Sequence, residues 1–196
     1  MDGFRRGIYK NIDGIQGPLS LAYDGTNSVR SVATATWSQA RLEGDITQSS
    51  IYTVGAYLNG LYLVHRAYFG FNTTEITSAI VGGIQINISF NNLLGPTNFA
   101  LVRTVVNHPA TYAWGIGDFT DSVGGVLHSN TVSVGPGATG VLNIPFNATG
   151  ISYINSTNDA TFVLVQVNND HLDVAPLASA NQVIQGLNTN VKLYYS

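Results

Sequence analysis

The sequence predicts an all-β protein, an antiparallel two-sheet β-sandwich of jelly-roll type with an extended N-terminal arm. Apolar and polar residues alternate over residues 84–90, which is the pattern of a strand with one buried face. Clusters of Gly, Pro, Asn and Asp recur at roughly the 8 to 12 residue spacing that is typical of sandwiches. No long amphipathic helix separates the strands, so an α/β nucleotide-binding fold is not expected.

Two further segments, 99–106 and 161–167, are apolar on both faces apart from a few polar positions, so both are predicted to be inner strands. Strand 84–90 lies with one face on the core. The side chains that we expect to face inward from this strand and from the strand before it are Ile84, Ile86, Ile88, Phe90, Phe69 and Phe71.

The C-terminal third contains the remaining elements. Alternation over 142–146 predicts a strand, and Pro145 places it at a sheet edge or at a strand end because proline lacks the N–H that a ladder requires. A short helix is predicted through residue 154, with Asn147 or Thr149 as its N-cap. Residues 191–195 form the last predicted strand.

The first part of the chain differs from the rest, because glycines interrupt its apolar residues. We predict an arm with one or two strands over 1–48 and a jelly-roll domain over 49–196. The arm would dock on the sandwich or on a neighbouring subunit. Equally open is that 1–48 supply the first strands of the same domain. The residues expected to anchor the arm are Phe4, Arg5, Arg6, Ile8, Tyr9, Ile12 and Ile15.

The composition is unusually poor in charge. Charged residues make up 10% of the 196 residues and hydrophobic residues 44%, whereas about 25% charged is usual in globular domains. This profile is typical of an all-β protein or of a subunit that buries much of its surface in an assembly. A net charge of −3 with only two lysines provides no basic surface for nucleic acid. The chain has no cysteine, which excludes disulfides and thiol chemistry.

No membrane association is predicted, because no stretch approaches the roughly 20 apolar residues of a membrane span. Arg5 and Arg6 near the start of the chain are not followed by an apolar run. A secretory signal is therefore not expected.

The sequence offers little material for catalysis. Acid catalysis by a carboxylate pair needs two acids placed across a cleft, and Glu43 and Glu75 are the only glutamates. The four histidines lack metal-binding spacing, and no nucleophile elbow or phosphate loop is present. We therefore predict no enzyme activity, no catalytic residue, no metal site and no cofactor.

Two aspartate pairs leave alternatives open. Asp118 and Asp121 could form a Ca²⁺ or general-acid site, but aspartates in a Gly-rich loop more often form a turn. Asp170 and Asp173 could hold a hard cation through their oxygens, or they could lie in a solvated loop.

Aromatic residues are the remaining candidates for binding. Tyr112 and Trp114 lie in a Gly-bordered loop and are expected to be exposed to a ligand or partner, together with Asp118 and Asp121. An exposed planar ring beside polar side chains suits the apolar face of a sugar. Alternatively, such aromatics pack against cross-strand neighbours.

Several segments resemble one known family. The strand and turn at 62–74, and the segments 105–110, 117–119 and 144–154, match in order and spacing the pattern of a bacterial and phage β-sandwich family. The resemblance extends over roughly residues 50–195. It implies a jelly-roll module of the kind found in phage structural and fibre proteins and in extracellular carbohydrate-binding proteins.

The resemblance implies a function by packing and display. The expected protein is a virion structural subunit, either a head decoration or cement protein or a fibre component. It would form a homo-oligomer, most simply a trimer, in contact with other virion proteins and with host surface glycans. The alternative is a secreted or cell-surface carbohydrate-binding module, located outside the cell.

Overall fold

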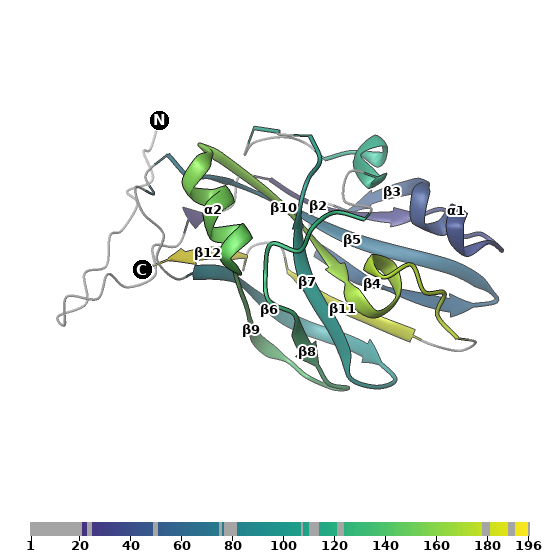
Figure 1. The fold of residues 1–196 in the computed structure, drawn as a ribbon. Helices are drawn as coiled ribbons and strands as arrows, with labels where there is room; N and C mark the ends of the chain where they lie inside the picture. The colour runs from purple at the N-terminus through teal and green to yellow at the C-terminus, as the bar shows by residue number, and fades with distance from the viewer. Residues whose placement is uncertain are drawn as a thin grey trace, which may run out of the picture.

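The computed structural model describes residues 21–22, 25–48, 51–74, 76, 82–106, 108–109, 114–120, 124–177, 181–187 and 191–195 (Figure 1). The strands are β1 (Leu21–Ala22), β2 (Gly25–Ser31), β3 (Gly44–Gln48), β4 (Ile51–Asn59), β5 (Leu61–Asn72), β6 (Gly82–Leu93), β7 (Thr97–Arg103), β8 (Val132–Val134), β9 (Gly140–Pro145), β10 (Asp159–Gln166), β11 (Asn181–Leu187) and β12 (Lys192–Tyr195). The helical elements are α1 (Trp37–Leu42), the 3-10 helix η1 (Ile116–Thr120), α2 (Ala148–Ser156) and the π-helical turn η2 (Val167–His171). The predicted all-β class is confirmed.

All strands belong to one continuous antiparallel sheet. Its main path runs β1-β12-β6-β11-β4-β5-β10-β7-β8, while β9 pairs with β6, β2 with β5, and β3 with β2. The sheet nearly closes on itself. Leu127 bridges to Val102 of β7, and Ser129 bridges to Phe146 at the end of β9, so residues 127–129 join the two ends. A division into two separate sheets is not confirmed.

The sheet forks at β5. His65 pairs with both Gly55 of β4 and Arg30 of β2, so those strands lie on opposite edges of β5. Beyond the fork, β10 pairs with residues 67–72 of β5. It takes the edge of β5 that β4 has left, because β2 occupies the opposite edge. The two branches, β4-β11-β6 and β10-β7-β8, then face each other across the interior.

Gly55 allows β4 to leave β5 at this fork. Its φ is +145°, which side chains rarely adopt, and a Cβ there would lie 2.0 Å from the carbonyl oxygen of Gln182 on β11. On β4 the side chains before the glycine, such as Val54, lie in the interior core. Ala56, directly after it, lies instead in a separate apolar cluster on the outer face of the sheet.

The interior core lies between the two branches and is entirely apolar in its centre. Residues of both branches meet there, for example Phe162 and Leu101 from one and Ile184 and Ile86 from the other. Aromatic rings pack edge to face within it: the ring centroids of Tyr153 and Phe162 are 5.5 Å apart. Helix α2 covers one end of this core, as Figure 1 shows.

A second, smaller cluster lies on the outer face of β5, β10 and β7. It contains Tyr68 and Val163 from the sheet, and it is covered by Ala40 of α1, by Phe119 of η1 and by Trp114. Both faces of β5 are therefore buried, and so are both faces of β10. This confirms the inner strand predicted at 161–167, except that Val167 begins η2; the inner strand predicted at 99–106 ends at Arg103, and Val105 and Val106 after it are exposed.

The predicted inward face of β6 is correct for its first half only. Ile84, Ile86 and Ile88 lie in the interior core, as do Phe69 and Phe71 of β5. Phe90 is 52% exposed, so its predicted burial is wrong. The register with β11 shifts here, because Gln185 faces Phe90 while Gly186 faces Ile88. The extra residue reverses the alternation, and Leu93 becomes the next buried apolar side chain.

Helix α2 confirms the predicted helix. The Asn147 side chain accepts a hydrogen bond from the Gly150 N–H, the geometry of an N-cap. Pro145 ends β9, which pairs with β6 alone, as the proline predicts. Helix α1 was not predicted. It has six residues and no side-chain N-cap bond, so tertiary packing of Ala40 and Arg41 holds it.

Residues 25–48 contribute β2 and β3 to the same sheet, with α1 between them. Residues 1–20 lie outside the described part of the chain, so the arm and its boundary at residue 48 stay predictions. The expected anchors in that range are Phe4, Arg5, Arg6, Ile8, Tyr9, Ile12 and Ile15. In the described residues, no helix is long and apolar enough to span a membrane.

The interior core predicts a large cost for truncating Ile86. This side chain is 1% exposed, so the change Ile86→Ala loses its burial and leaves a cavity, at a cost of about 2–5 kcal/mol in the free energy of unfolding. Urea denaturation measures the difference. Val141→Ala is the matched control: Val141 is exposed on neighbouring β9, and its loss should cost less than about 0.5 kcal/mol. An unchanged midpoint for Ile86→Ala contradicts the core assignment.

The buried His65 predicts a pH dependence of stability. Burial, and then the nearby charge of Arg30, lower the pKa of His65 to about 4. An unfolded chain with the ordinary pKa of 6.5 therefore binds the proton first. Stability is complete above pH 6.5 and falls as the pH drops toward 4, by at most about 1.4 kcal/mol per pH unit. His65→Gln should flatten this slope in urea titrations at several pH values. Parallel slopes in the two proteins contradict the assignment.

Candidate functional site

The four predicted contact residues fall on one segment, and two of them are described. Tyr112 and Asp121 lie outside the described residues. Trp114 is only 2% exposed, so the expectation that it is an exposed contact is wrong. Its ring stacks on Tyr68 of β5 with centroids 5.0 Å apart, and His108 meets it edge to face at 4.8 Å. Trp114 packs as a cover over the second cluster.

Asp118 lies in the first turn of η1, where its carboxylate stabilises the local fold. Its Oδ2 accepts a hydrogen bond of 2.8 Å from the Gly115 N–H. Its Oδ1 lies 3.9 Å from the Nε2 of His108. In the described residues no group of three or more His, Asp or Glu side chains could hold a metal ion.

The main polar centre of the molecule lies directly beneath this segment. Arg66 of β5 is 1% exposed, and its guanidinium forms two hydrogen bonds with the Asp170 carboxylate, at 2.8 Å from Nε and 2.6 Å from Nη2. Further bonds run from Arg66 to the carbonyl oxygens of Phe119 and Arg41. The guanidinium also lies over the Phe119 ring, 4.2 Å from its centroid.

Arg41 of α1 extends this centre to the surface. Its Nε donates to the Asp170 carbonyl oxygen at 3.0 Å, and its Nη1 pairs with Asp173 at 2.8 Å. Trp37 donates its Nε1–H to the same Asp173 carboxylate at 3.1 Å. We call Arg66, Asp170 and Arg41 the charged centre. For Asp170 both alternatives, a cation site and a solvated loop, are wrong, because the ion pair occupies its carboxylate. Asp173 is 63% exposed, as the solvated loop predicted.

Backbone geometry fixes Asp170 in this position. The Gln166 side chain, at the end of β10, accepts hydrogen bonds from the N–H groups of Asn169 and Asp170 at 3.1 and 3.3 Å. Burial alone would lower the pKa of Arg66, but the adjacent Asp170 carboxylate outweighs it, so the pKa is raised. Arg66 therefore remains fully charged. This paired charge holds structure together and leaves no free group for chemistry.

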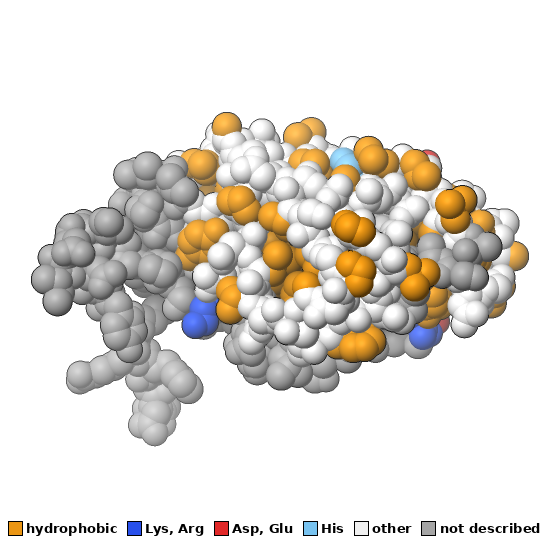
Figure 2. All heavy atoms as spheres, turned by 90° about the horizontal axis from the view of Figure 1, so that it is seen from below, with side chains coloured by type: hydrophobic (Ala, Val, Ile, Leu, Met, Phe, Trp, Pro, Cys, Tyr) orange, Lys and Arg blue, Asp and Glu red, His pale blue; other side chains and the backbone are white. Residues whose placement is uncertain are grey.

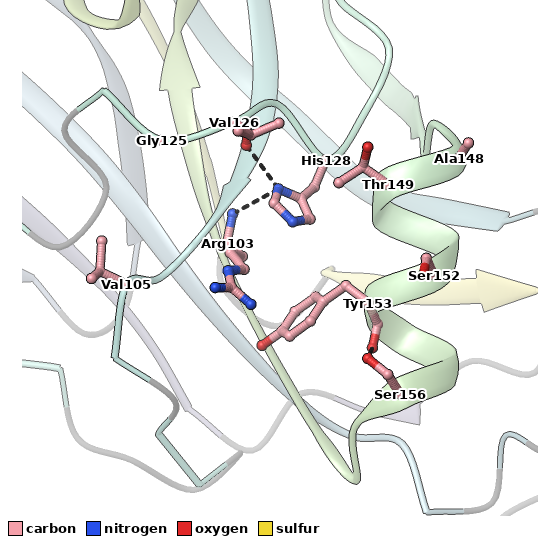
Figure 3. Close-up of a pocket in the computed structure, with 10 residues that line it drawn as sticks. All are labelled: Arg103, Val105, Gly125, Val126, His128, Ala148, Thr149, Ser152, Tyr153 and Ser156. Carbon is pink, nitrogen blue, oxygen red and sulfur yellow. Dashed lines mark hydrogen bonds between the residues drawn. The ribbon is translucent and has the colours of Figure 1, made fainter.

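A groove on another side of the molecule is the best candidate for binding. It has a volume of about 740 Å³ and lies between α2, the end of β7 and the segment before residue 129 (Figure 3). Helix α2 presents one face to it, with residues spaced as i, i+3, i+4 and i+7. These residues are Thr149, Ser152, Tyr153 and Ser156. Val105 and Val126 form exposed apolar walls opposite.

Arg103 supplies the positive charge of the groove. Its guanidinium lies over the Tyr153 ring, 5.6 Å from the centroid, which is a favourable cation–π position. No carboxylate of the described residues forms an ion pair with it, in contrast to Arg30, Arg41 and Arg66. The groove therefore favours a ligand with a negative group and an apolar part.

His128 lines the groove and is bound to the backbone through Nδ1. Its Nδ1 lies 2.8 Å from the Val126 carbonyl oxygen and 3.4 Å from the Arg103 backbone nitrogen. The shorter contact requires a proton on Nδ1. Burial lowers the His128 pKa, the Val126 bond partly opposes this, and Arg103 lowers it further. The imidazole packs edge to face against the Tyr153 ring, with centroids 5.6 Å apart.

The sequence did not reveal this groove or the charged centre. The residues on the groove-facing side of α2 could be identified from their spacing in the sequence once Asn147 was taken as the N-cap of the helix. Arg103 and Val126 join that face only through pairing of β7 with β10 and with residue 127. Similarly, Arg66 and Asp170 are 104 positions apart in the chain.

No known family model matches the chain, and no curated protein matches its sequence. The resemblance to the bacterial and phage β-sandwich family stays a prediction.

The charged centre predicts unequal roles for Asp170, which belongs to it, and for Asp173, which pairs with Arg41 at the surface. Asp170→Asn leaves the buried charge of Arg66 uncompensated and should lower the free energy of unfolding by about 3–5 kcal/mol. Asp173→Asn is the matched control, because Asp173 also pairs with Arg41 but is 63% exposed. It should cost less than about 1 kcal/mol. Denaturant unfolding of both variants tests this, and equal losses contradict the central role of the buried pair.

Proposed function

We propose that the protein is a non-enzymatic structural subunit of a phage virion, a head decoration, cement or fibre component that works by packing into an assembly. The observation that carries the proposal is the surface, on which large apolar side chains are exposed while charged ones are few. Figure 2 shows apolar side chains spread over one face with very few charges between them. The exposed large apolar residues are Leu42, Leu61, Phe90, Leu94, Val105, Val106, Ile116, Val126, Val141, Leu172, Val174 and Leu177.

Such a surface favours association in water. Each apolar side chain removed from water contributes about 1.5–3 kcal/mol when fully buried, and few charges oppose close approach of another protein. The edge strands β3 and β9 also carry backbone groups that a neighbour can pair with. Assembly with copies of itself and with other virion proteins satisfies both features.

The finer fold assignment belongs to the same proposal. A forked sheet whose branches enclose one apolar core supports a jelly-roll relationship, because strands of a jelly roll likewise pass between two facing layers. In this proposal the N-terminal arm reaches a neighbouring subunit or the capsid surface, and the location is the virion.

Carbohydrate binding is a second candidate, and the hydroxyl-bearing face of α2 beside Arg103 favours it. The aromatic residues expected to stack on a sugar support it less, because Trp114 and Tyr153 are both buried. Under this candidate the protein is an extracellular carbohydrate-binding module. Binding to a panel of acidic and neutral glycans, lost on Arg103→Ala, would favour it over a purely structural role.

The assembly proposal predicts the mass of the protein in solution. Light scattering of the purified full chain should give a homo-oligomer, with a trimer of about 63 kDa as the expected species, three times the 20.9 kDa of one chain. Its interfaces should bury more than about 1,000 Å² in total. A mass of one chain at every concentration tested contradicts the proposal.

A further inference from the structure

The segment 172–177, directly after η2, is the most apolar exposed segment of the described chain. Leu177 is 83% exposed, Leu172 60% and Val174 52%. Burying such side chains usually stabilises a fold, yet here three large apolar side chains in a stretch of six residues face solvent. An exposed apolar cluster of this kind marks a contact surface.

The first half of the segment, residues 172–174, is held in position by the fold. Asp173 has a left-handed backbone with φ of 56°, which residues other than glycine seldom adopt. Hydrogen bonds fix both of its neighbours: the Leu172 N–H donates to Val167 at 3.1 Å, and the Val174 N–H donates to Asn169 at 2.9 Å. Arg41 of the charged centre holds the Asp173 side chain. A preorganised segment loses little conformational freedom when it binds.

The groove beside α2 has the complementary properties. Val105 and Val126 are both 67% exposed and offer apolar contact. Arg103 has no ion-pair partner in the described part of the chain, while the Asp173 side chain of segment 172–177 remains 63% exposed. The apolar side chains and outward carboxylate of the segment thus complement the apolar walls of the groove and its Arg103, which has no ion pair among the described residues.

The two surfaces cannot meet within one molecule. Asp173 is bound to α1 through Trp37 and Arg41, whereas the groove is formed by α2. Figure 1 shows α1 and α2 at opposite ends of the sheet. A contact between them must therefore join two copies head to tail, and such contacts form a ring when the rotation closes.

We infer that segment 172–177 of one copy docks in the groove between α2 and residues 124–128 of the next copy. Leu172, Val174 and Leu177 lie against Val105 and Val126, and Asp173 approaches Arg103. This inference rests on the proposed self-association and specifies its interface.

Charged substitutions test the contact. We expect Leu177→Glu and Val126→Glu each to reduce the light-scattering mass of the full chain to that of one subunit. Each variant keeps one intact half of the contact, so mixing the two should restore a species of two chains. If instead each surface bound the identical surface of another copy, mixing the two variants would not restore a species of two chains. Leu94→Glu, in the turn between β6 and β7, is the matched control and should leave the mass unchanged.

Cysteine cross-linking provides the second measurement, and the natural chain has no cysteine to interfere. An oxidised mixture of Leu177→Cys and Val126→Cys should give a linked dimer on a non-reducing gel, while either variant alone should not. Circular dichroism checks that all variants fold.

The outcomes separate this inference from the proposed function. If the unmodified protein is oligomeric but both charged variants keep its mass and the cysteine mixture does not link, the contact is wrong and self-association stands. A single-chain mass for the unmodified protein overturns both.

Discussion

The ion pair between Arg66 and Asp170 is the interaction on which the arrangement of the outer layer depends. A guanidinium in the middle of a strand buried on both faces is tolerable only when a carboxylate and carbonyl oxygens satisfy it. Those partners come from η2, α1 and η1, so one side chain determines where three separate elements lie. The apolar residues around it would pack in many ways, but the directional bonds select one.

The two layers of packing have different sources of stability. The interior core is apolar and is enclosed by branches of a single sheet, so burial of side chains stabilises it. The outer cluster is thinner, and its cover of α1, η1 and Trp114 is held by polar contacts as well as by packing. The same polar contacts end at Asp173, where they fix the conformation of the exposed segment 172–177. Stability of the outer layer and the shape of the surface are thereby linked.

The parts of the fold that local pattern determines were predictable from the sequence. Asn147 marked the start of α2, and alternation identified the buried face of β6 as far as Ile88. The prediction for Phe90 was wrong because a bulge depends on the partner strand, which the local pattern does not contain. Trp114 was misplaced for a similar reason: its glycine neighbours indicate a loop, and only the fold places Tyr68 beneath that loop.

The candidate site was harder to predict than the fold. Its decisive contacts join residues far apart in the chain, such as Arg103 with Tyr153 or Arg66 with Asp170. Neither pair belongs to a motif with fixed spacing. Arginine within an apolar strand was the available signal, since an isolated charge there requires a buried partner.

The order in which the strands are synthesised means that the charge of Arg66 also has an effect before the chain is folded. β5 leaves the ribosome with β4, but β10 and Asp170 follow about 100 residues later, which is about 5–20 s at ordinary rates of elongation. During this interval residues 67–72 of β5, which later pair with β10, have an open edge, the kind of segment that aggregates. A charge in the centre of β5 opposes stacking of nascent chains, and the same charge is neutralised only when its partner arrives. Arg66 therefore has the charge and the position, inside a hydrophobic strand, that are typical of gatekeeper residues.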